Sequence, residues 1–220
     1  MMKKSIFTTL ALAIGLWACT NPRPESLQAQ LPNLSVEALA ELEQATFAGG
    51  CFWCTEAVFE RVKGVADVIS GYSGGSAKDA NYKKVSYGLT DHAECVQIYY
   101  DPEMITYMEL VKIFMGTHDP TTLNRQGPDV GAQYRSEIFY HNDQQRKDAV
   151  SYVKELESAN KYKDPIVTKV TAYDTFYPAE DYHQDYYRLN PDQPYIVAVA
   201  KPKVAKFKKY FSEYVKEPGS

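Results

Sequence analysis

The order of strand-like and helix-like segments between residues 45 and 173 limits this 220-residue chain to a mixed fold. Strand-like runs occur at 45–47, 65–75, 92–100, 135–140 and 167–173. Helical spacing of apolar residues occurs at 52–64, at 107–116 and after Asn142, a residue type that caps helices. This order predicts an α/β or α+β fold, a two-layer sandwich in which helices pack on a mixed sheet.

The length fits one domain with appendages, because domains most often span about 100 to 200 residues. We expect this domain to span residues 45–216. Beyond Tyr173 the chain is rich in tyrosine and proline, which predicts a long coil-rich wrap and then a helix after Pro202. The formal charge of −4 and the lack of a long Lys/Arg block argue against nucleic acid as a partner.

The N-terminus has the pattern of an export signal, with two lysines in residues 1–4 and an apolar run in 5–18. That run is shorter than the roughly 20 residues that a membrane span needs. The letters LWAC at 16–19 resemble the lipobox of bacterial lipoprotein signals, whose cysteine is acylated. We therefore expect a signal peptide at 1–18, a tether at 19–44 and a membrane attachment only through a lipid on Cys19. Ordinary secretion with cleavage elsewhere is the alternative.

The clearest strand, at 92–100, places a carboxyl on an apolar face. Alternation puts Glu94 on the same face as Val96 and Ile98, and Cys95 on the opposite face. Burial on such a face raises the pKa of a carboxyl, because it disfavours the charged form. The alternative is an ordinary solvated carboxylate. Cys95 is expected to be a small buried hydrophobe.

Two cysteines, Cys51 and Cys54, stand at the start of the predicted helix 52–64, directly after two glycines. Free backbone N–H groups and the helix dipole favour an anion there. Such a position can lower the pKa of a thiol to roughly 3.5 to 7.5. Cys54 lies one turn on, where it can form a disulfide with Cys51. The order favours Cys51 as a nucleophile and Cys54 as the thiol that resolves it.

Other uses of this CxxC spacing remain open. A zinc site could add His92 and Cys95 to the two cysteines, but these two point to opposite faces of their strand, so we expect no metal. A purely structural disulfide would close a short loop and stabilise little. A thioredoxin-like thiol-disulfide exchange protein is the stronger rival, since it too has CxxC at a helix start after a strand. It would not explain the polar residues gathered in glycine-rich loops.

Five segments carry a resemblance to a known family. They read GGCFWCTE, GYSGG, NYKKVSYGLTDHAE, DPTTLNRQGPDVGAQYRS and YPAEDYHQDYY. In order and spacing they resemble the A-type peptide methionine sulfoxide reductases, from about Thr46 to beyond Tyr187. The resemblance implies reduction of the S epimer of methionine sulfoxide, free or in oxidised proteins. It also implies a thioredoxin-type dithiol as reductant and no metal or organic cofactor.

Carried over to this sequence, the resemblance makes Cys51 the nucleophile that attacks the sulfoxide sulfur and becomes a sulfenic acid. Phe52 and Trp53 would form the apolar pocket for the S-methyl group of the substrate. Sulfur and methyl groups pack well on aromatic rings, at about 0.3 to 1.5 kcal/mol per contact. Ordinary core packing is the alternative for this aromatic pair.

The resemblance assigns the polar residues as well. Glu94 would pass a proton to the sulfoxide oxygen, which at pH 7 requires a pKa raised from about 4.3 to near 7. Tyr82 and Tyr134 would donate hydrogen bonds to the same oxygen. Asp129 would contact the substrate backbone or order the loop that carries Tyr134. His183 also belongs to the pattern, and we expect a structural role for it.

The sequence departs from the family in informative places. The C-terminal segment FKKYFSEYVKEPGS has no resolving cysteine, so Cys54 is expected to resolve Cys51. Ser86 replaces an internal cysteine of the loop pattern, and Asp91 replaces a glycine and adds charge. Together these features predict a monomeric reductase of the bacterial cell envelope that repairs oxidised proteins.

Overall fold

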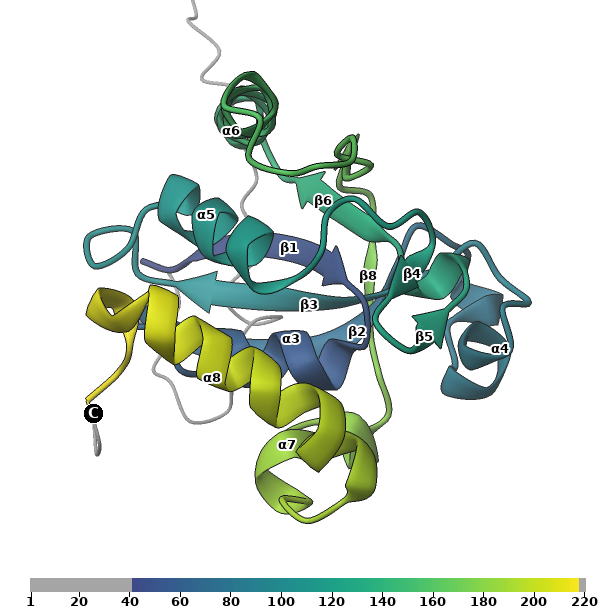
Figure 1. Ribbon diagram of the computed structural model, residues 1–220. Helices are drawn as coiled ribbons and strands as arrows, with labels where there is room; N and C mark the ends of the chain where they lie inside the picture. Colours follow the sequence, from purple (N-terminus) through teal and green to yellow (C-terminus); the bar gives the residue numbers. More distant parts are fainter. Residues whose placement is uncertain (1–40, 218–220) are drawn as a thin grey trace, which may run out of the picture. The chain divides into compact units, whose positions relative to one another are not determined.

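The computed structural model describes residues 41–217, so the predicted signal peptide, Cys19 and residues 19–40 of the tether lie outside the described residues. The described part is built on a six-stranded sheet (Figure 1). Its strands are β1 (Glu43–Gly49), β2 (Val65–Ser73), β3 (Ala93–Tyr100), β6 (Ser136–Tyr140), β7 (Lys169–Ala172) and β8 (Phe176–Pro178). They lie in the order β7-β6-β1-β3-β2-β8. The β6–β7 pair is parallel, whereas the other neighbours are antiparallel.

Helices cover the sheet. They are α3 (Phe52–Phe59), α4 (Tyr82–Ser86), α5 (Tyr107–Thr117), α6 (Asp143–Ser158), α7 (Tyr186–Leu189) and α8 (Lys201–Tyr210), with a π-helical turn, η4 (Ile196–Ala200), before α8. A separate ribbon pairs β4 (Arg125–Gln126) with β5 (Asp129–Val130). Figure 1 shows α3, α5 and α8 together on one side of the sheet. This arrangement confirms the predicted mixed sheet with helices packed on it.

The central strand β3 is buried along its whole length and separates two apolar clusters. Val96 and Ile98 belong to the main core, which also contains Phe47. Cys95, on the opposite face, lies in a smaller buried cluster with Phe139. The predicted alternation of this strand is therefore confirmed, and burial raises the pKa of the Cys95 thiol to about 12.

Helix α3 is shorter than the sequence pattern predicted. It ends at Phe59 instead of continuing to residue 64. Val62 lies in the turn that follows the helix and is fully buried, and Val65 already belongs to β2. The helix-like spacing of these apolar residues therefore comes from a buried turn. Gly64 has φ +79, and a Cβ there would stand 2.8 Å from the side chain of Met104. This glycine therefore shapes the turn into β2 and does not stop the helix.

The segment after Tyr173 contains more regular structure than a coil-rich wrap. Strand β8 extends the sheet by pairing with β2, and the short helix α7 follows. Neither was predicted, because β8 is only three residues long and ends in Pro178. The predicted C-terminal helix is present as α8, with a proline in its first turn. Within residues 41–217 no helix is long and apolar enough to cross a membrane.

Candidate functional site

Cys51 is the residue that caps the N-terminus of α3, at the turn between β1 and the helix. The turn depends on Gly50, whose φ of +91 lies in the left-handed region that favours glycine. A Cβ at Gly50 would stand 2.5 Å from the side chain of Gln126. The backbone at Gly50 therefore packs closely against Gln126 of β4. Cys51 is a free thiol and is only 6% exposed.

Cys54 lies one helical turn beyond Cys51 and is also a free, buried thiol. The backbone N–H of Cys54 donates to the carbonyl oxygen of Cys51 at 3.1 Å, which closes the first turn of α3. The Cys54 thiol also lies 3.9 Å from the hydroxyl oxygen of Tyr195 and donates to it. The two cysteines therefore sit at the same helix end, as their spacing suggested.

The pKa values of the two thiols are shifted in opposite directions in this structure. Burial raises the pKa of Cys51 well above 9.0, and the neighbouring Cys54 and Glu94 add to the rise. The hydrogen bond from Cys51 lowers the pKa of Cys54 to about 7. The expectation that the helix N-terminus lowers the pKa of Cys51 is therefore not met in this structure. Burial is the largest cause of this rise, because a thiolate removed from water loses its hydration.

Glu94 lies beside the start of α3, where its Oε2 accepts a hydrogen bond from the backbone N–H of Phe52 at 3.1 Å. The side chain is 1% exposed. Burial raises the pKa of Glu94 to about 8, and the single backbone hydrogen bond opposes this rise only in part. Glu94 is therefore mostly a neutral carboxylic acid at pH 7, which can donate a proton.

A pocket of about 190 Å³ opens over Cys51 and Glu94. Its other lining residues are Phe52, Trp53, Tyr82, Asp129, Tyr134 and Tyr195. The structure thus brings together every predicted site residue within the described range except Cys54, which lines a separate small hollow. The pocket joins apolar rings, hydroxyl donors, one neutral acid and one thiol at a single point.

The apolar wall of the pocket is made of stacked rings. Trp53 stacks on Tyr186 with ring centroids 3.9 Å apart, and Phe52 stacks on Tyr82 at 6.4 Å. The indole N–H of Trp53 donates to Nδ1 of His183 at 3.1 Å. These contacts hold the rings in place without closing the pocket. A sulfur-bound methyl group packs well against such rings.

Tyr82 and Tyr134 are the two lining residues that were expected to donate hydroxyl hydrogen bonds. Burial raises the pKa of Tyr82 to about 12 and that of Tyr134 further still. Both therefore remain hydrogen-bond donors at neutral pH. Tyr82 is positioned by Glu180, whose Oε1 accepts the backbone N–H of Tyr82 at 3.0 Å. The other oxygen of Glu180 accepts the hydroxyl of Tyr72 at 2.9 Å.

Tyr195 is a pocket residue that the sequence did not reveal. Its hydroxyl donates a hydrogen bond to Asp129 Oδ2 and accepts one from the Cys54 thiol. It therefore links the carboxylate in the pocket to the buried cysteine. No local signal marks Tyr195, because it stands in a segment rich in tyrosine and follows Cys54 by 141 residues.

His183 lies behind the aromatic wall of the pocket and contacts two of its rings. It is 1% exposed, accepts from Trp53 and packs on the ring of Tyr82 with centroids 4.2 Å apart. Burial lowers its pKa, which favours the neutral ring that such acceptance requires.

The two other residues of the zinc hypothesis make other contacts. His92 hydrogen-bonds the carbonyl of Ser76, and the Cys95 thiol donates to the carbonyl of Gly71. No cluster of three His, Cys, Asp or Glu residues in 41–217 could hold a metal ion.

The family model described as "Peptide methionine sulfoxide reductase" matches residues 43–215. The chain is 57% identical over 177 residues to peptide methionine sulfoxide reductase MsrA 1 of Rhodopirellula baltica, an alignment that covers 80% of this chain and 91% of that protein. It is 46% identical over 192 residues to peptide methionine sulfoxide reductase MsrA of Deinococcus radiodurans, an alignment that covers 87% of this chain and 93% of that protein.

Solved structures agree with these relatives. Methionine sulfoxide reductase A of Corynebacterium diphtheriae matches with a TM-score of 0.63 and 32% identity, covering 78% of this chain and 83% of that chain. Mxr1 of Saccharomyces cerevisiae in reduced form matches with a TM-score of 0.64 and 38% identity, covering 70% of this chain and 88% of that chain. Sequence and fold together show that this chain is an oxidoreductase of the peptide methionine sulfoxide reductase family, of the MsrA type.

Proposed function

We propose that this protein reduces the S epimer of methionine sulfoxide, in oxidised proteins or as the free amino acid. The observation that carries the proposal is the meeting of the Cys51 thiol and the neutral carboxyl of Glu94 at one aromatic-walled pocket. A sulfoxide needs a nucleophile for its sulfur, a proton for its oxygen and an apolar surface for its methyl group. The pocket offers all three within a space that fits one side chain.

In the first step, Cys51 loses its proton and attacks the sulfoxide sulfur. Glu94 donates a proton to the sulfoxide oxygen, while the hydroxyls of Tyr82 and Tyr134 donate hydrogen bonds to it. The oxygen then moves to the Cys51 sulfur: the S–O bond of the substrate and the transient bond between the two sulfurs break, and an S–O bond forms on Cys51. Methionine leaves, and Cys51 is a sulfenic acid. The substrate gains two electrons and the Cys51 sulfur loses two. Asp129, whose Oδ2 accepts from the Tyr195 hydroxyl, would contact the substrate backbone or order the loop that carries Tyr134.

In the second step, Cys54 attacks the sulfenic acid. A Cys51–Cys54 disulfide forms and the oxygen leaves as water. The support for this step is the placement of both thiols at one end of α3 and the low pKa of Cys54, about 7, which supplies thiolate at neutral pH. A thioredoxin-type dithiol protein then restores both thiols by exchange. The cycle requires no metal or organic cofactor, and the protein acts as a monomer.

We further propose that the protein works in the bacterial cell envelope. The support is the sequence of residues 1–19, with its two lysines, its apolar run and the LWAC pattern. A lipid on Cys19 would anchor the protein, and the reductant would then be an exported or membrane-supplied dithiol protein. Lipid labelling of wild type and Cys19→Ala tests the anchor: labelling that persists in the variant excludes it.

The decisive experiment is turnover of the two sulfoxide epimers with dithiothreitol, using wild type and Cys54→Ser side by side. The proposal expects reduction of the S epimer alone. It also expects about one methionine per molecule of Cys54→Ser before turnover slows, because the sulfenic acid is no longer resolved internally. Reduction of a disulfide substrate with no reduction of either epimer would instead support a thioredoxin-like exchange protein.

A further inference from the structure

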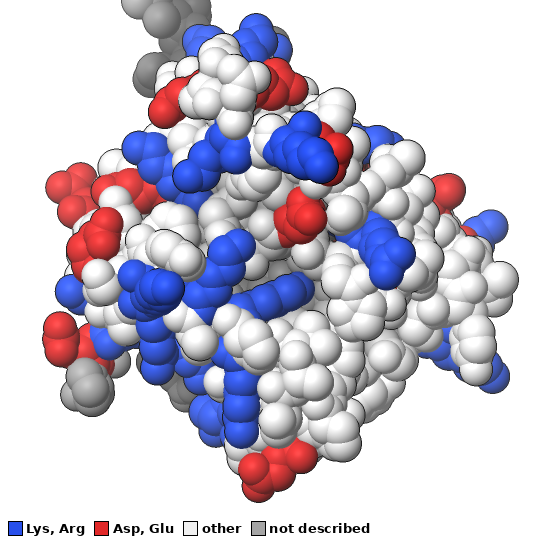
Figure 2. All heavy atoms as spheres, viewed as in Figure 1, with Lys and Arg blue, Asp and Glu red and all other residues white. Residues whose placement is uncertain are grey.

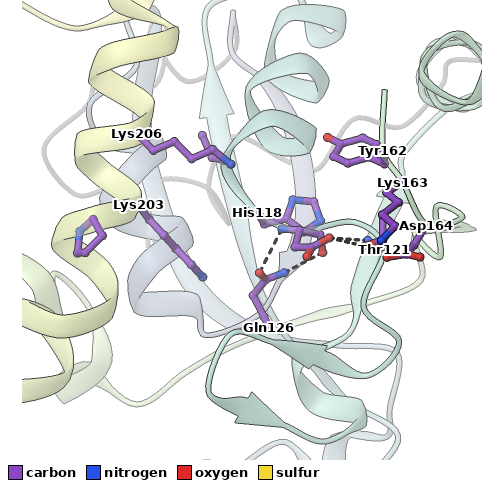
Figure 3. Close-up of a pocket in the computed structure, with 11 residues that line it drawn as sticks. His118, Thr121, Gln126, Tyr162, Lys163, Asp164, Lys203 and Lys206 are labelled. Carbon is purple, nitrogen blue, oxygen red and sulfur yellow. Dashed lines mark hydrogen bonds between the residues drawn. The ribbon is translucent and has the colours of Figure 1, made fainter. Parts of the chain in front are cut away.

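A second cleft, distinct from the sulfoxide pocket, lies between α8 and the end of α5. It encloses about 560 Å³ and is lined from α8 by Lys203 and Lys206 and from the opposite side by His118 and Gln126 (Figure 3). In Figure 2, Lys and Arg side chains gather over α8 and around the hollow beside it. The role proposed above for the sulfoxide pocket does not involve this cleft.

Lys203 connects this cleft to the cysteines. Figure 3 shows its side chain extending from α8 into the cleft. Lys203 also lines a small hollow with Cys54, Thr55 and His118, which lies between the cleft and helix α3. Its Nζ would stand 3.8 Å from a Cβ at Gly50, which places the ammonium beside the turn that presents Cys51.

The ammonium of Lys203 has no hydrogen-bond partner among residues 41–217, although its Nζ atom is buried. A buried cation without a partner is unfavourable, because it loses hydration and gains nothing in return. An anion at Cys54 would compensate this cost. The only other lysine of α8 in the cleft, Lys206, does not line the hollow that contains Cys54.

We infer that Lys203 is a positioning residue for the resolving step, and that its ammonium stabilises Cys54 as a thiolate. This inference rests on the proposed function, in which Cys54 resolves Cys51. When Cys54 attacks the sulfenic acid, an S–S bond forms, an S–O bond breaks, and the oxygen leaves as water. The dithiol reductant later gives up two electrons and forms its own disulfide, which restores both thiols and so the Cys54 thiolate beside Lys203.

The electrostatic environment of Cys54 agrees with this role. Its pKa falls to about 7, first through the hydrogen bond from Cys51 and then through the charge of Lys203, against the effects of burial and of Asp129. Tyr195, Glu94 and His118 also face this region, and the hydrogen bond with Tyr195 lowers the pKa of Cys54 as well. Burial lowers the pKa of His118 to about 4, so its ring is neutral and adds no positive charge. Lys203 is thus the cation that acts on Cys54.

The test is the equilibrium between the Cys51–Cys54 disulfide and dithiothreitol, measured from pH 5.5 to 8.5 on the full-length protein. The variants are Lys203→Met, Lys203→Arg and Lys206→Met. Lys206→Met is the matched control, since it removes a cation from the same helix and the same cleft. Wild-type protein is first oxidised with methionine sulfoxide, and the methionine released and thiols lost are counted.

Stabilising a thiolate favours the reduced enzyme only where that thiolate exists, above its pKa. If loss of Lys203 raises the pKa of Cys54 by about one pH unit, the equilibrium constant for reduction falls about fivefold at pH 8. At pH 5.5 it stays unchanged. Lys203→Arg and Lys206→Met are expected to follow wild type across the range.

The two possible failures are distinguishable. If wild type releases no methionine or loses no thiols with methionine sulfoxide, the proposed function fails. If wild type forms the disulfide but Lys203→Met keeps the wild-type pH dependence, only the role of Lys203 is overturned. A fall of equal size at pH 5.5 and pH 8, or an equal effect of Lys206→Met, overturns that role as well. Circular dichroism of each variant shows that it is folded.

Discussion

The backbone N–H of Phe52 donates to Oε2 of Glu94 at 3.1 Å, which ties the first residue of α3 to the central strand β3. This contact fixes the distance between the acid and the cysteine that precedes Phe52. It occupies one carboxyl oxygen and leaves the other for the pocket. Because burial raises the pKa of Glu94 to about 8, that carboxyl can carry a proton at neutral pH.

Replacing Glu94 with Gln should reduce turnover of the S epimer by about 100-fold or more, the range expected when a general acid is lost. The amide keeps the acceptor for Phe52 but supplies no acidic proton. The control is Glu56→Gln, because Glu56 is equally buried, has a pKa raised by burial to about 8, and lies outside the pocket. Steady-state kinetics measure both variants. Near-normal turnover in Glu94→Gln contradicts the assignment.

The same carboxyl makes stability depend on pH. Its pKa rises from about 4.3 in an unfolded chain to about 8 in the fold, so the folded state binds the extra proton between these values. The contribution of Glu94 to the free energy of unfolding is therefore largest below pH 4 and falls as the pH rises to 8. Urea unfolding at pH 5, 6.5 and 8 measures this. Wild type should lose stability relative to Glu94→Gln as the pH rises, and a constant difference contradicts the buried neutral acid.

Removing the hydroxyls of Tyr82 and Tyr134 should slow the sulfoxide step. Each hydroxyl is expected to donate to an oxygen that gains negative charge, and such hydrogen bonds contribute about 1.5 to 3 kcal/mol, or more than tenfold in rate. The variants are Tyr82→Phe and Tyr134→Phe, with Tyr87→Phe as the control, because Tyr87 is 73% exposed. Single-turnover release of methionine is the measurement. Equal rates in all three variants would show that these hydroxyls do not assist the reaction.

Gly50 is expected to tolerate no side chain. Gly50→Ala combines a φ of +91 with a Cβ only 2.5 Å from Gln126. Gly127→Ala is the matched control, since its φ of +59 is also positive but nothing lies within 4 Å of its Cβ. The control should lose about 1 kcal/mol, whereas Gly50→Ala should lose more and displace Cys51. Thermal unfolding and turnover measure both. Equal losses would mean that contact with Gln126 does not constrain the turn.

Local patterns in the sequence determined which residues of a strand face the core and where a helix begins. Alternation along 92–100 placed Glu94 on the core face and Cys95 on the opposite one, and the structure has both positions. The cap at Asn142 was also readable, since its side chain accepts from the backbone N–H of Gln145 at 2.9 Å. Such features depend on residues that are close in the chain, so the repeat of a strand or a single capping residue reveals them.

Only the tertiary structure decided the pKa values of the two thiols and the residues that lie next to Cys54. The start of a helix was expected to lower the pKa of Cys51, yet burial and the neighbouring Cys54 and Glu94 raise it. Tyr195 and Lys203 reach Cys54 from more than 140 residues away. Desolvation and charge act through space, and the packing of α8 against α3 sets these distances. A pattern read along the chain contains no information about them.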